Sequence, residues 1–318
     1  MGSDLAVIVD ADSRKNLSEL QNRWFGEIKQ NDKDYLIEPP IGGKPIEVYG
    51  TLVRNPKLSE HSAEYLYLEL TNTCNFACRH CGVKGDVNHI KDSTLVDDNA
   101  PYLTEKFVDA LAESLKRHPF PGLERKLFYG GGEPLISPKK FAKINNKLAQ
   151  LKRTYPVVIT NGCSLPLDQN DFYKFMEDIG SPYLFFTLST EHNRQYERIS
   201  KNDSLHGYMP LKSDDSEEAI RLKIWTINRY CSEKELGFSV LALNSKDGKG
   251  KKLEEDLRKQ IIKEALDIEI HTIEQDEKRE PCSQGMELSI RANGDLYPYC
   301  TDIFNGHPKL GVIGLLRK

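Results

Sequence analysis

Three cysteines stand close together in the stretch Cys74-Asn-Phe-Ala-Cys78-Arg-His-Cys81, a CxxxCxxC arrangement. Three thiolates on one short loop can hold three irons of a [4Fe–4S] cluster and leave the fourth iron open to a small ligand. Two other interpretations of the spacing remain open. One is a zinc site completed by His80 or His89, and the other is a group of cysteines that binds no metal. The spacing alone favours the iron–sulfur cluster.

Polar and glycine-rich stretches follow three later strands of the predicted sheet. They are Tyr129-Gly-Gly-Gly-Glu133-Pro-Leu135, Thr160-Asn161-Gly162 and Ser189-Thr190-Glu191. Glycines let the backbone approach a ligand closely, and a carboxylate together with backbone carbonyls can accept hydrogen bonds from an ammonium group. Each stretch also has an ordinary structural interpretation: a glycine-rich βα turn, a common tight turn, and the cap of a helix.

The elements that must position these residues alternate along the chain. Alternating or buried apolar runs predict strands, and apolar residues at helical spacing predict helices between them. The strands are expected at 65–71, 126–130, 156–160, 181–189, 237–243 and 266–273, and the helices at 103–118, 137–153, 171–180, 216–236 and 253–265. This order predicts an α/β fold: a partial (β/α)6 TIM-type barrel with a small C-terminal β-hairpin extension. Such a sheet brings the residues at the carboxyl ends of its strands together.

The order and placement of all four stretches resemble the radical S-adenosylmethionine (SAM) superfamily, from residue 64 to about 273. The resemblance implies that Cys74, Cys78 and Cys81 hold a catalytic [4Fe–4S] cluster. It also implies that the open iron binds SAM, which the cluster cleaves reductively to a 5′-deoxyadenosyl radical. The residues that the resemblance places around these cofactors are Phe76, His80, Gly131, Gly132, Glu133, Thr160, Asn161, Ser189 and Glu191.

The C-terminal stretch contains two more cysteines, Cys282 and Cys300, on either side of a hairpin signal at Asn293-Gly294. It resembles a shortened SPASM or twitch extension, in which such cysteines ligate an auxiliary iron–sulfur cluster. The chain departs from that pattern because no cysteine follows Cys300. Four interpretations stay open: a hairpin without a cluster, an unusual auxiliary cluster, a redox or hydrogen-donor thiol, and plain buried cysteines. Cys163 and Cys231 are expected to be buried core residues.

Three domains are predicted on this basis. Residues 1–62 are expected to be an irregular N-terminal extension of unknown role with one helix near 17–28. Residues 63–275 are the radical SAM core barrel, and residues 276–318 are the truncated extension.

Composition narrows the function classes. The chain has 44 Lys and Arg against 48 Asp and Glu, a net charge of −4, and it lacks the basic excess of a dedicated nucleic-acid binder. It contains no apolar run long enough for a membrane span, and its amino terminus does not resemble a signal peptide. A cytoplasmic location without membrane association is expected.

The resemblance implies an enzyme, an oxidoreductase or maturase, that abstracts a hydrogen atom from a peptide or protein side chain. The alternative substrate is a carbohydrate, an aminocyclitol or another small molecule that undergoes epimerisation or dehydrogenation. An electron donor such as flavodoxin or ferredoxin is the implied partner. A hypothesis of a different class is a non-catalytic iron–sulfur or zinc-binding module.

Overall fold

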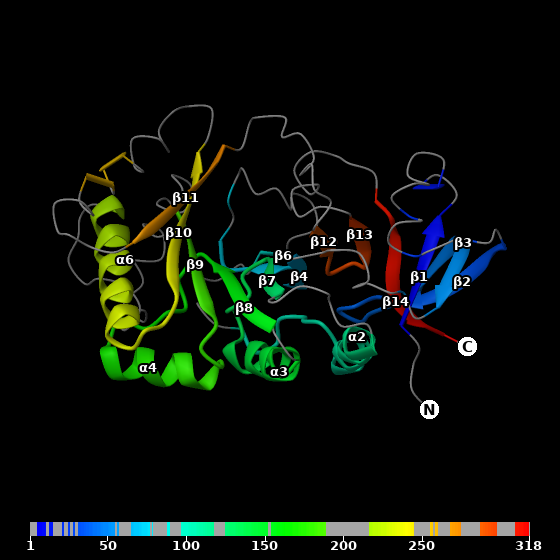
Figure 1. Cartoon of the computed structure of the whole chain (residues 1–318), viewed down its shortest axis with the longest axis horizontal. Coiled ribbons are helices and arrows are strands. Elements are labelled where there is room, and N and C mark those ends of the chain that lie inside the picture. The colour runs from blue at the N-terminus through cyan, green and yellow to red at the C-terminus, as the bar shows by residue number, and fades with distance from the viewer. Residues whose placement is uncertain are drawn as a thin grey trace.

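The computed structural model describes residues 5–10, 13–14, 21, 25, 28, 31–54, 56, 65–76, 78, 88–89, 97–117, 125–151, 154–188, 216–244, 255–256, 258–259, 268–274, 287–297 and 309–317. In these ranges one sheet of 12 strands runs through the length of the molecule (Figure 1). The strand order is β1-β3-β2-β14-β13-β12-β4-β7-β8-β9-β10-β11. A second sheet consists of the short strands β5 (Thr73–Cys74) and β6 (Asn88–His89).

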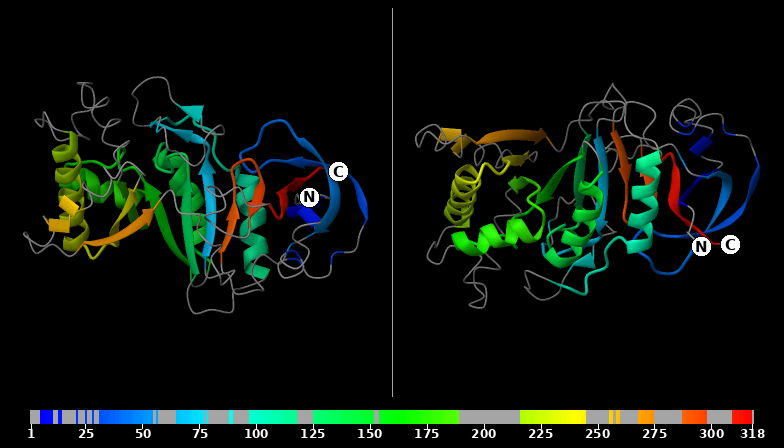
Figure 2. Two further views of the ribbon diagram at one scale, coloured as in Figure 1. Left: turned by 90° about the horizontal axis from the view of Figure 1, so that it is seen from above. Right: turned by 60° about the horizontal axis from the view of Figure 1, so that its bottom comes forward.

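Half of the large sheet is the predicted parallel core. Neighbouring strands in chain order pair in parallel from β4 to β11, and helices pack on the outside of this curved part (Figures 1 and 2). The strands are β4 (Tyr65–Thr71), β7 (Arg125–Gly131), β8 (Thr154–Thr160), β9 (Tyr183–Leu188), β10 (Phe238–Asn244) and β11 (Glu269–Glu274). The helices are α2 (Glu105–Arg117), α3 (Pro138–Ala149), α4 (Gln169–Asp178) and α6 (Ser216–Glu233). The predicted α/β fold with a partial barrel is confirmed, whereas the helix expected at 253–265 lies mostly outside the described residues.

The two faces of the first barrel strand differ in chemistry because successive side chains of a strand point to opposite faces. Leu66, Leu68 and Leu70 are fully buried in the main hydrophobic core. The alternate residues, including Glu69 and Thr71, belong to the opposite face, where Glu69 is only 2% exposed. A buried carboxylate needs a hydrogen-bond or charge partner, so this face of the strand carries the polar contacts described below.

The chain ends are ordered as strands, which corrects the prediction of an irregular N-terminal extension. They are β1 (Leu5–Asp10), β2 (Asp32–Glu38), β3 (Ile46–Arg54) and β14 (Gly311–Leu316). The predicted hairpin is confirmed as β12 (Glu287–Ile290) and β13 (Asp295–Tyr297), with Gly294 at a φ of 94° in its turn. β12 pairs in parallel with β4 and so attaches the hairpin to the barrel. The helix predicted near 17–28 falls mostly outside the described residues.

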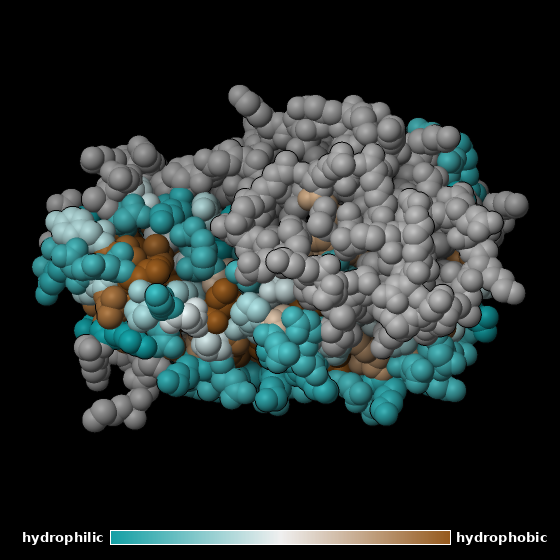
Figure 3. All heavy atoms as spheres, turned by 180° about the vertical axis from the view of Figure 1, so that it is seen from behind, coloured by the Kyte–Doolittle hydropathy of each residue, from teal (hydrophilic) through white to brown (hydrophobic). Residues whose placement is uncertain are grey.

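The strands β1, β2, β3 and β14 together form a closed ring. β1 pairs with β3, β3 with β2, β2 with β14, and β14 again with β1, all antiparallel. Ala6, Ile8, Ile37 and Val312 form a separate apolar cluster between these strands. Apolar residues reach the surface on the side of the molecule that holds these strands (Figure 3). We call this unit, residues 5–10, 32–38, 46–54 and 311–316, the terminal β ring.

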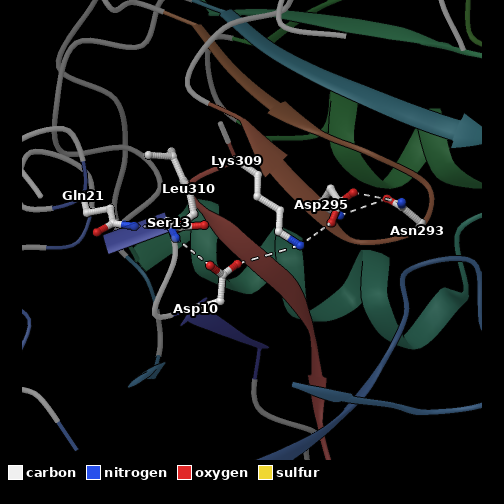
Figure 4. Close-up of polar contacts among 7 residues, drawn as sticks. All are labelled: Asp10, Ser13, Gln21, Asn293, Asp295, Lys309 and Leu310. Carbon is white, nitrogen blue, oxygen red and sulfur yellow. Dashed lines mark hydrogen bonds and ion pairs between the residues drawn. The ribbon is translucent and has the colours of Figure 1, made fainter. Parts of the chain in front are cut away.

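Polar contacts also join the two ends of the chain (Figure 4). The Lys309 ammonium lies 3.3 Å from Asp295 Oδ1, beside the hairpin, and 3.8 Å from Asp10 Oδ2 at the end of β1. The side chain of Gln21 donates a hydrogen bond of 3.1 Å to the carbonyl of Leu310. No helix in the described part of the chain is long and apolar enough to cross a membrane.

Candidate active site

The cysteine loop begins directly at the carboxyl end of the first barrel strand. Cys74 and Cys78 are partly exposed, and neither forms a disulfide within the described residues. The backbone N–H of Phe76, a buried residue, donates to Cys74 Sγ at 3.3 Å. This contact holds the Cys74 sulfur in position at the start of the loop. His80 and Cys81 lie outside the described residues.

The glycine-rich loop after β7 runs alongside the cysteine loop. The N–H of Gly132 donates to the carbonyl of Thr71, and the N–H of Glu133 donates to that of Thr73, both at 2.8 Å. A Cβ atom at Gly132 would lie 2.0 Å from the Thr73 carbonyl oxygen. Gly131 has a φ of 103°, in the region that favours glycine. Only glycines allow the two loops to approach this closely.

Glu133 is buried, at 1% exposed, and its carboxylate is held by three groups. Oε1 accepts from Thr160 Oγ1 at 2.7 Å and from the N–H of Leu135 at 3.0 Å, and Oε2 accepts from the N–H of Asn161 at 2.8 Å. Burial raises the pKa of Glu133 to about 7, although these hydrogen bonds oppose the shift. The predicted residues Glu133, Thr160 and Asn161 therefore lie together.

Asn161 connects this cluster to the cysteine loop. Its side-chain amide donates to Asn75 Oδ1 at 2.8 Å and lies 4.0 Å from Cys74 Sγ. Its Oδ1 accepts from the N–H of Cys163 at 3.0 Å, which fixes the side-chain orientation. Asn161, in the turn after β8, thus contacts both the Glu133 carboxylate and the loop that carries Cys74.

Lys223 is a buried residue near the site that the sequence analysis missed. It lies on α6, is 0% exposed, and donates from Nζ to the carbonyl of Cys163 at 3.2 Å. The signal was present in the sequence. Lys223 is three residues after Ile220 and four residues before Ile227, a spacing that places it on the same buried face of the helix as these two isoleucines. A lysine on an apolar helix face indicates a buried charge.

Glu69 and Arg291 form a second buried pair that the sequence analysis missed. Arg291 Nε lies 3.2 Å from Glu69 Oε1, and their side chains are 9% and 3% exposed. Glu69 Oε2 also accepts from the N–H of Ala292 at 3.1 Å. Arg291 directly follows β12, so this pair joins the hairpin to the strand that leads into the cysteine loop.

Four other predicted site residues lie outside the described residues: Ser189, Glu191, Cys282 and Cys300. Cys163 and Cys231 are buried at 0% and 1% exposure, as predicted for core residues. His271 on β11 packs edge-on against Phe185, with 5.1 Å between ring centroids.

Comparison with known proteins identifies the class. The radical SAM superfamily model matches residues 68–220, which include the cysteine loop, the glycine-rich loop and the turn after β8. The chain thus contains a radical SAM domain. It is an enzyme of SAM radical chemistry, and its cofactors are a [4Fe–4S] cluster and SAM. Such an enzyme needs an electron donor and a substrate.

Solved structures of two proteins are similar to the chain. One is described as hexahistidine-tagged anSMEcpe with bound AdoMet, at 12% identity and a TM-score of 0.48, with 78% of this chain and 74% of that chain covered. The other is BtrN in complex with AdoMet and 2-DOIA, at 14% identity and a TM-score of 0.41, with 80% and 79% covered. A search of curated protein sequences gives no significant match.

Proposed function

We propose that Cys74, Cys78 and Cys81 hold the [4Fe–4S] cluster and that the residues around Glu133 bind SAM. The observation that carries this proposal is the hydrogen-bonded contact between the cysteine loop and the glycine-rich loop. The residues present fit both groups. Cys74 and Cys78 are partly exposed thiols after a barrel strand. Glu133, a buried carboxylate that can accept from an ammonium group, lies on the glycine-rich loop that is hydrogen-bonded to this segment.

Glu133 is the residue best suited to bind the amino group of SAM. A carboxylate offers about four acceptor positions, and the described residues use two on Oε1 and one on Oε2. The remaining position on Oε2 can accept from an ammonium group. Gly131 and Gly132 contribute backbone carbonyls, and Thr160 and Asn161 hold the carboxylate in place. Phe76, His80, Ser189 and Glu191 complete the proposed set of SAM contacts.

The bound cluster and SAM supply one-electron cleavage of SAM to a 5′-deoxyadenosyl radical, which removes a hydrogen atom from substrate. The chain's own residues position the reactants and exclude water. Phe128 on β7 and Phe185 on β9 form an aromatic contact between two barrel strands, with their ring centroids 6.1 Å apart.

Anaerobic reconstitution tests the proposal. The wild-type protein should contain about four irons per chain and should form 5′-deoxyadenosine when dithionite and SAM are added. Cys74→Ala should lose both the iron and the product. Cys231→Ala is a matched control, because Cys231 is a buried core thiol on α6. Stoichiometric zinc with no 5′-deoxyadenosine would instead favour the non-catalytic module.

We propose a peptide or protein side chain as the substrate, supported by the resemblance of the C-terminal stretch to a shortened SPASM or twitch extension. The alternative is a carbohydrate, an aminocyclitol or another small molecule. The two substrate classes are distinguished by adding candidate compounds of each class and measuring which of them increases 5′-deoxyadenosine formation. A deuterated form of the true substrate should transfer deuterium to 5′-deoxyadenosine. A flavodoxin or a ferredoxin is the proposed electron donor.

An auxiliary cluster at Cys282 and Cys300 stays a prediction. Iron analysis decides it, because a second [4Fe–4S] cluster would raise the content to about eight irons per chain. The double variant Cys282→Ala, Cys300→Ala should keep about four irons in either case.

A further inference from the structure

The turn after β8 lies between two buried side chains of opposite charge. On one side the carboxylate of Glu133 accepts from Thr160 Oγ1 and from the N–H of Asn161. On the other side the ammonium of Lys223 donates to the carbonyl of Cys163. Both charged residues are at most 1% exposed. An isolated buried charge is costly, and a nearby opposite charge offsets part of that cost.

Few other ionisable groups surround this pair within the described residues. The Cys163 thiol lies close to Lys223, and the Tyr102 hydroxyl, which donates to the carbonyl of Pro134, lies close to Glu133. Burial holds the pKa of Tyr102 well above its ordinary value, so its hydroxyl is neutral at physiological pH. Among the residues that the structure describes, Lys223 is therefore the cation whose charge acts on Glu133.

We propose that Lys223 is a positioning residue of the SAM site: its buried ammonium fixes the turn that carries Asn161 and favours the ionised form of the Glu133 carboxylate, which meets the amino group of SAM. This inference rests on the proposed role of Glu133. Lys223 acts from behind the turn, through the Cys163 carbonyl and through its electric field. Asn161 transmits the position of the turn to the cysteine loop through its hydrogen bond to Asn75.

The electrostatic part of the role predicts how SAM binding depends on pH. Burial raises the pKa of Glu133 to about 7, and the charge of Lys223 opposes that shift. Burial lowers the pKa of Lys223 to about 8, so its ammonium is present where Glu133 ionises. Removal of the ammonium therefore raises the pKa of Glu133 further, and SAM should need a higher pH to bind.

The test measures SAM binding by calorimetry from pH 6 to pH 8.5 in the reconstituted full-length protein. In Lys223→Met the midpoint of the binding profile should move upward by on the order of one pH unit. Lys223→Gln keeps a donor for the Cys163 carbonyl but no charge, and it should show the same shift. Lys234→Met is the matched control, because Lys234 follows α6 and is exposed; its profile should equal that of the wild type.

The possible outcomes separate this inference from the proposed function. Wild-type protein that binds no SAM would contradict the proposed function itself. A wild-type profile that depends on Glu133, together with an unmoved midpoint in Lys223→Met, would overturn the role of Lys223 alone. A Lys223→Gln protein with the wild-type profile would also overturn it, because a hydrogen bond without charge would then suffice. Should Lys223→Met fail to fold, Lys223→Gln supplies the same comparison.

Discussion

Glu133 combines deep burial with a task that requires a negative charge. A carboxyl group with a pKa of about 7 is protonated in half of the molecules at neutral pH, whereas an exposed glutamate is ionised almost completely. The protonated form cannot attract an ammonium group. The pH at which the site operates therefore depends on how the surroundings of this one side chain balance burial against hydrogen bonds and the charge of Lys223.

SAM affinity should fall as the pH drops below 7. Between pH 7.5 and pH 6 the ionised fraction of Glu133 decreases, so the affinity should decrease by roughly five- to tenfold. The α-amino group of SAM stays mostly protonated over this range and does not cause the change. Calorimetry on the reconstituted protein measures the effect. Glu133→Gln should bind SAM more weakly at every pH and without this dependence, and a wild-type affinity that is constant over the range would contradict the argument.

Gly132→Ala should disrupt the contact between the two loops. Its Cβ would lie 2.0 Å from the carbonyl oxygen of Thr73, a backbone atom that cannot move without moving Cys74. We expect SAM affinity to fall by at least about tenfold and the absorbance of the bound cluster to change. Gly43→Ala is the control: its φ of 107° makes the substitution strained, but no atom lies within 4 Å of the added Cβ. Equal cluster spectra and SAM affinities in the two variants would show that the contact is unimportant.

At the level of elements, the hairpin and the barrel meet through a buried ion pair. Glu69 lies on β4 and Arg291 directly follows β12, and the pairing of these two strands brings the side chains together although they lie far apart in the sequence. Removing one partner of such a pair takes away the opposite charge that the other partner meets in a buried place, and this costs about 3–5 kcal/mol.

Arg291→Met should therefore lower the free energy of unfolding by about 3–5 kcal/mol. Adding Glu69→Gln removes the remaining charge and keeps an acceptor for the N–H of Ala292, so the double variant should be more stable than Arg291→Met alone. Urea unfolding of the four proteins of this cycle gives the coupling. Purely additive effects of the two substitutions would mean that the two charges do not interact.

The sequence predicted the parallel core well because its signals are local. Each barrel strand is a short apolar run beside an amphipathic helix, and both can be read from neighbouring residues. The cysteine and glycine-rich loops were found for the same reason. Lys223 and the Glu69–Arg291 pair were missed because their importance comes from partners that are distant in the sequence. Sequence periodicity shows that a position is buried, but it does not show which charge it meets.

The same limit explains the error in residues 1–62. The run LAVIVD is a strand that pairs on one side with β3 and on the other with β14, at the other end of the chain. The residues next to it in the sequence do not show the pairing with β14. The predicted domain boundaries near residues 62 and 276 stay predictions, yet the pairings join the two outer segments into the terminal β ring. The ring is attached to the barrel through β13 and β12.

Ile8→Asp should open the terminal β ring as a unit. Ile8 is 0% exposed in the ring's own apolar cluster, and its strand pairs with both β3 and β14. An unpaired carboxylate there is strongly destabilising. Because each strand of a closed ring has two partners, the loss of β1 exposes the edges of β3 and β14 together. Hydrogen exchange should then show lost protection at 46–54 and 311–316, whereas α3 should stay protected.

Leu36→Asp, at a position 43% exposed on β2, is the control and should leave protection unchanged. If protection were lost only at residues 5–10, the other strands of the ring would be stable without β1. The two ends of the chain would then not depend on each other.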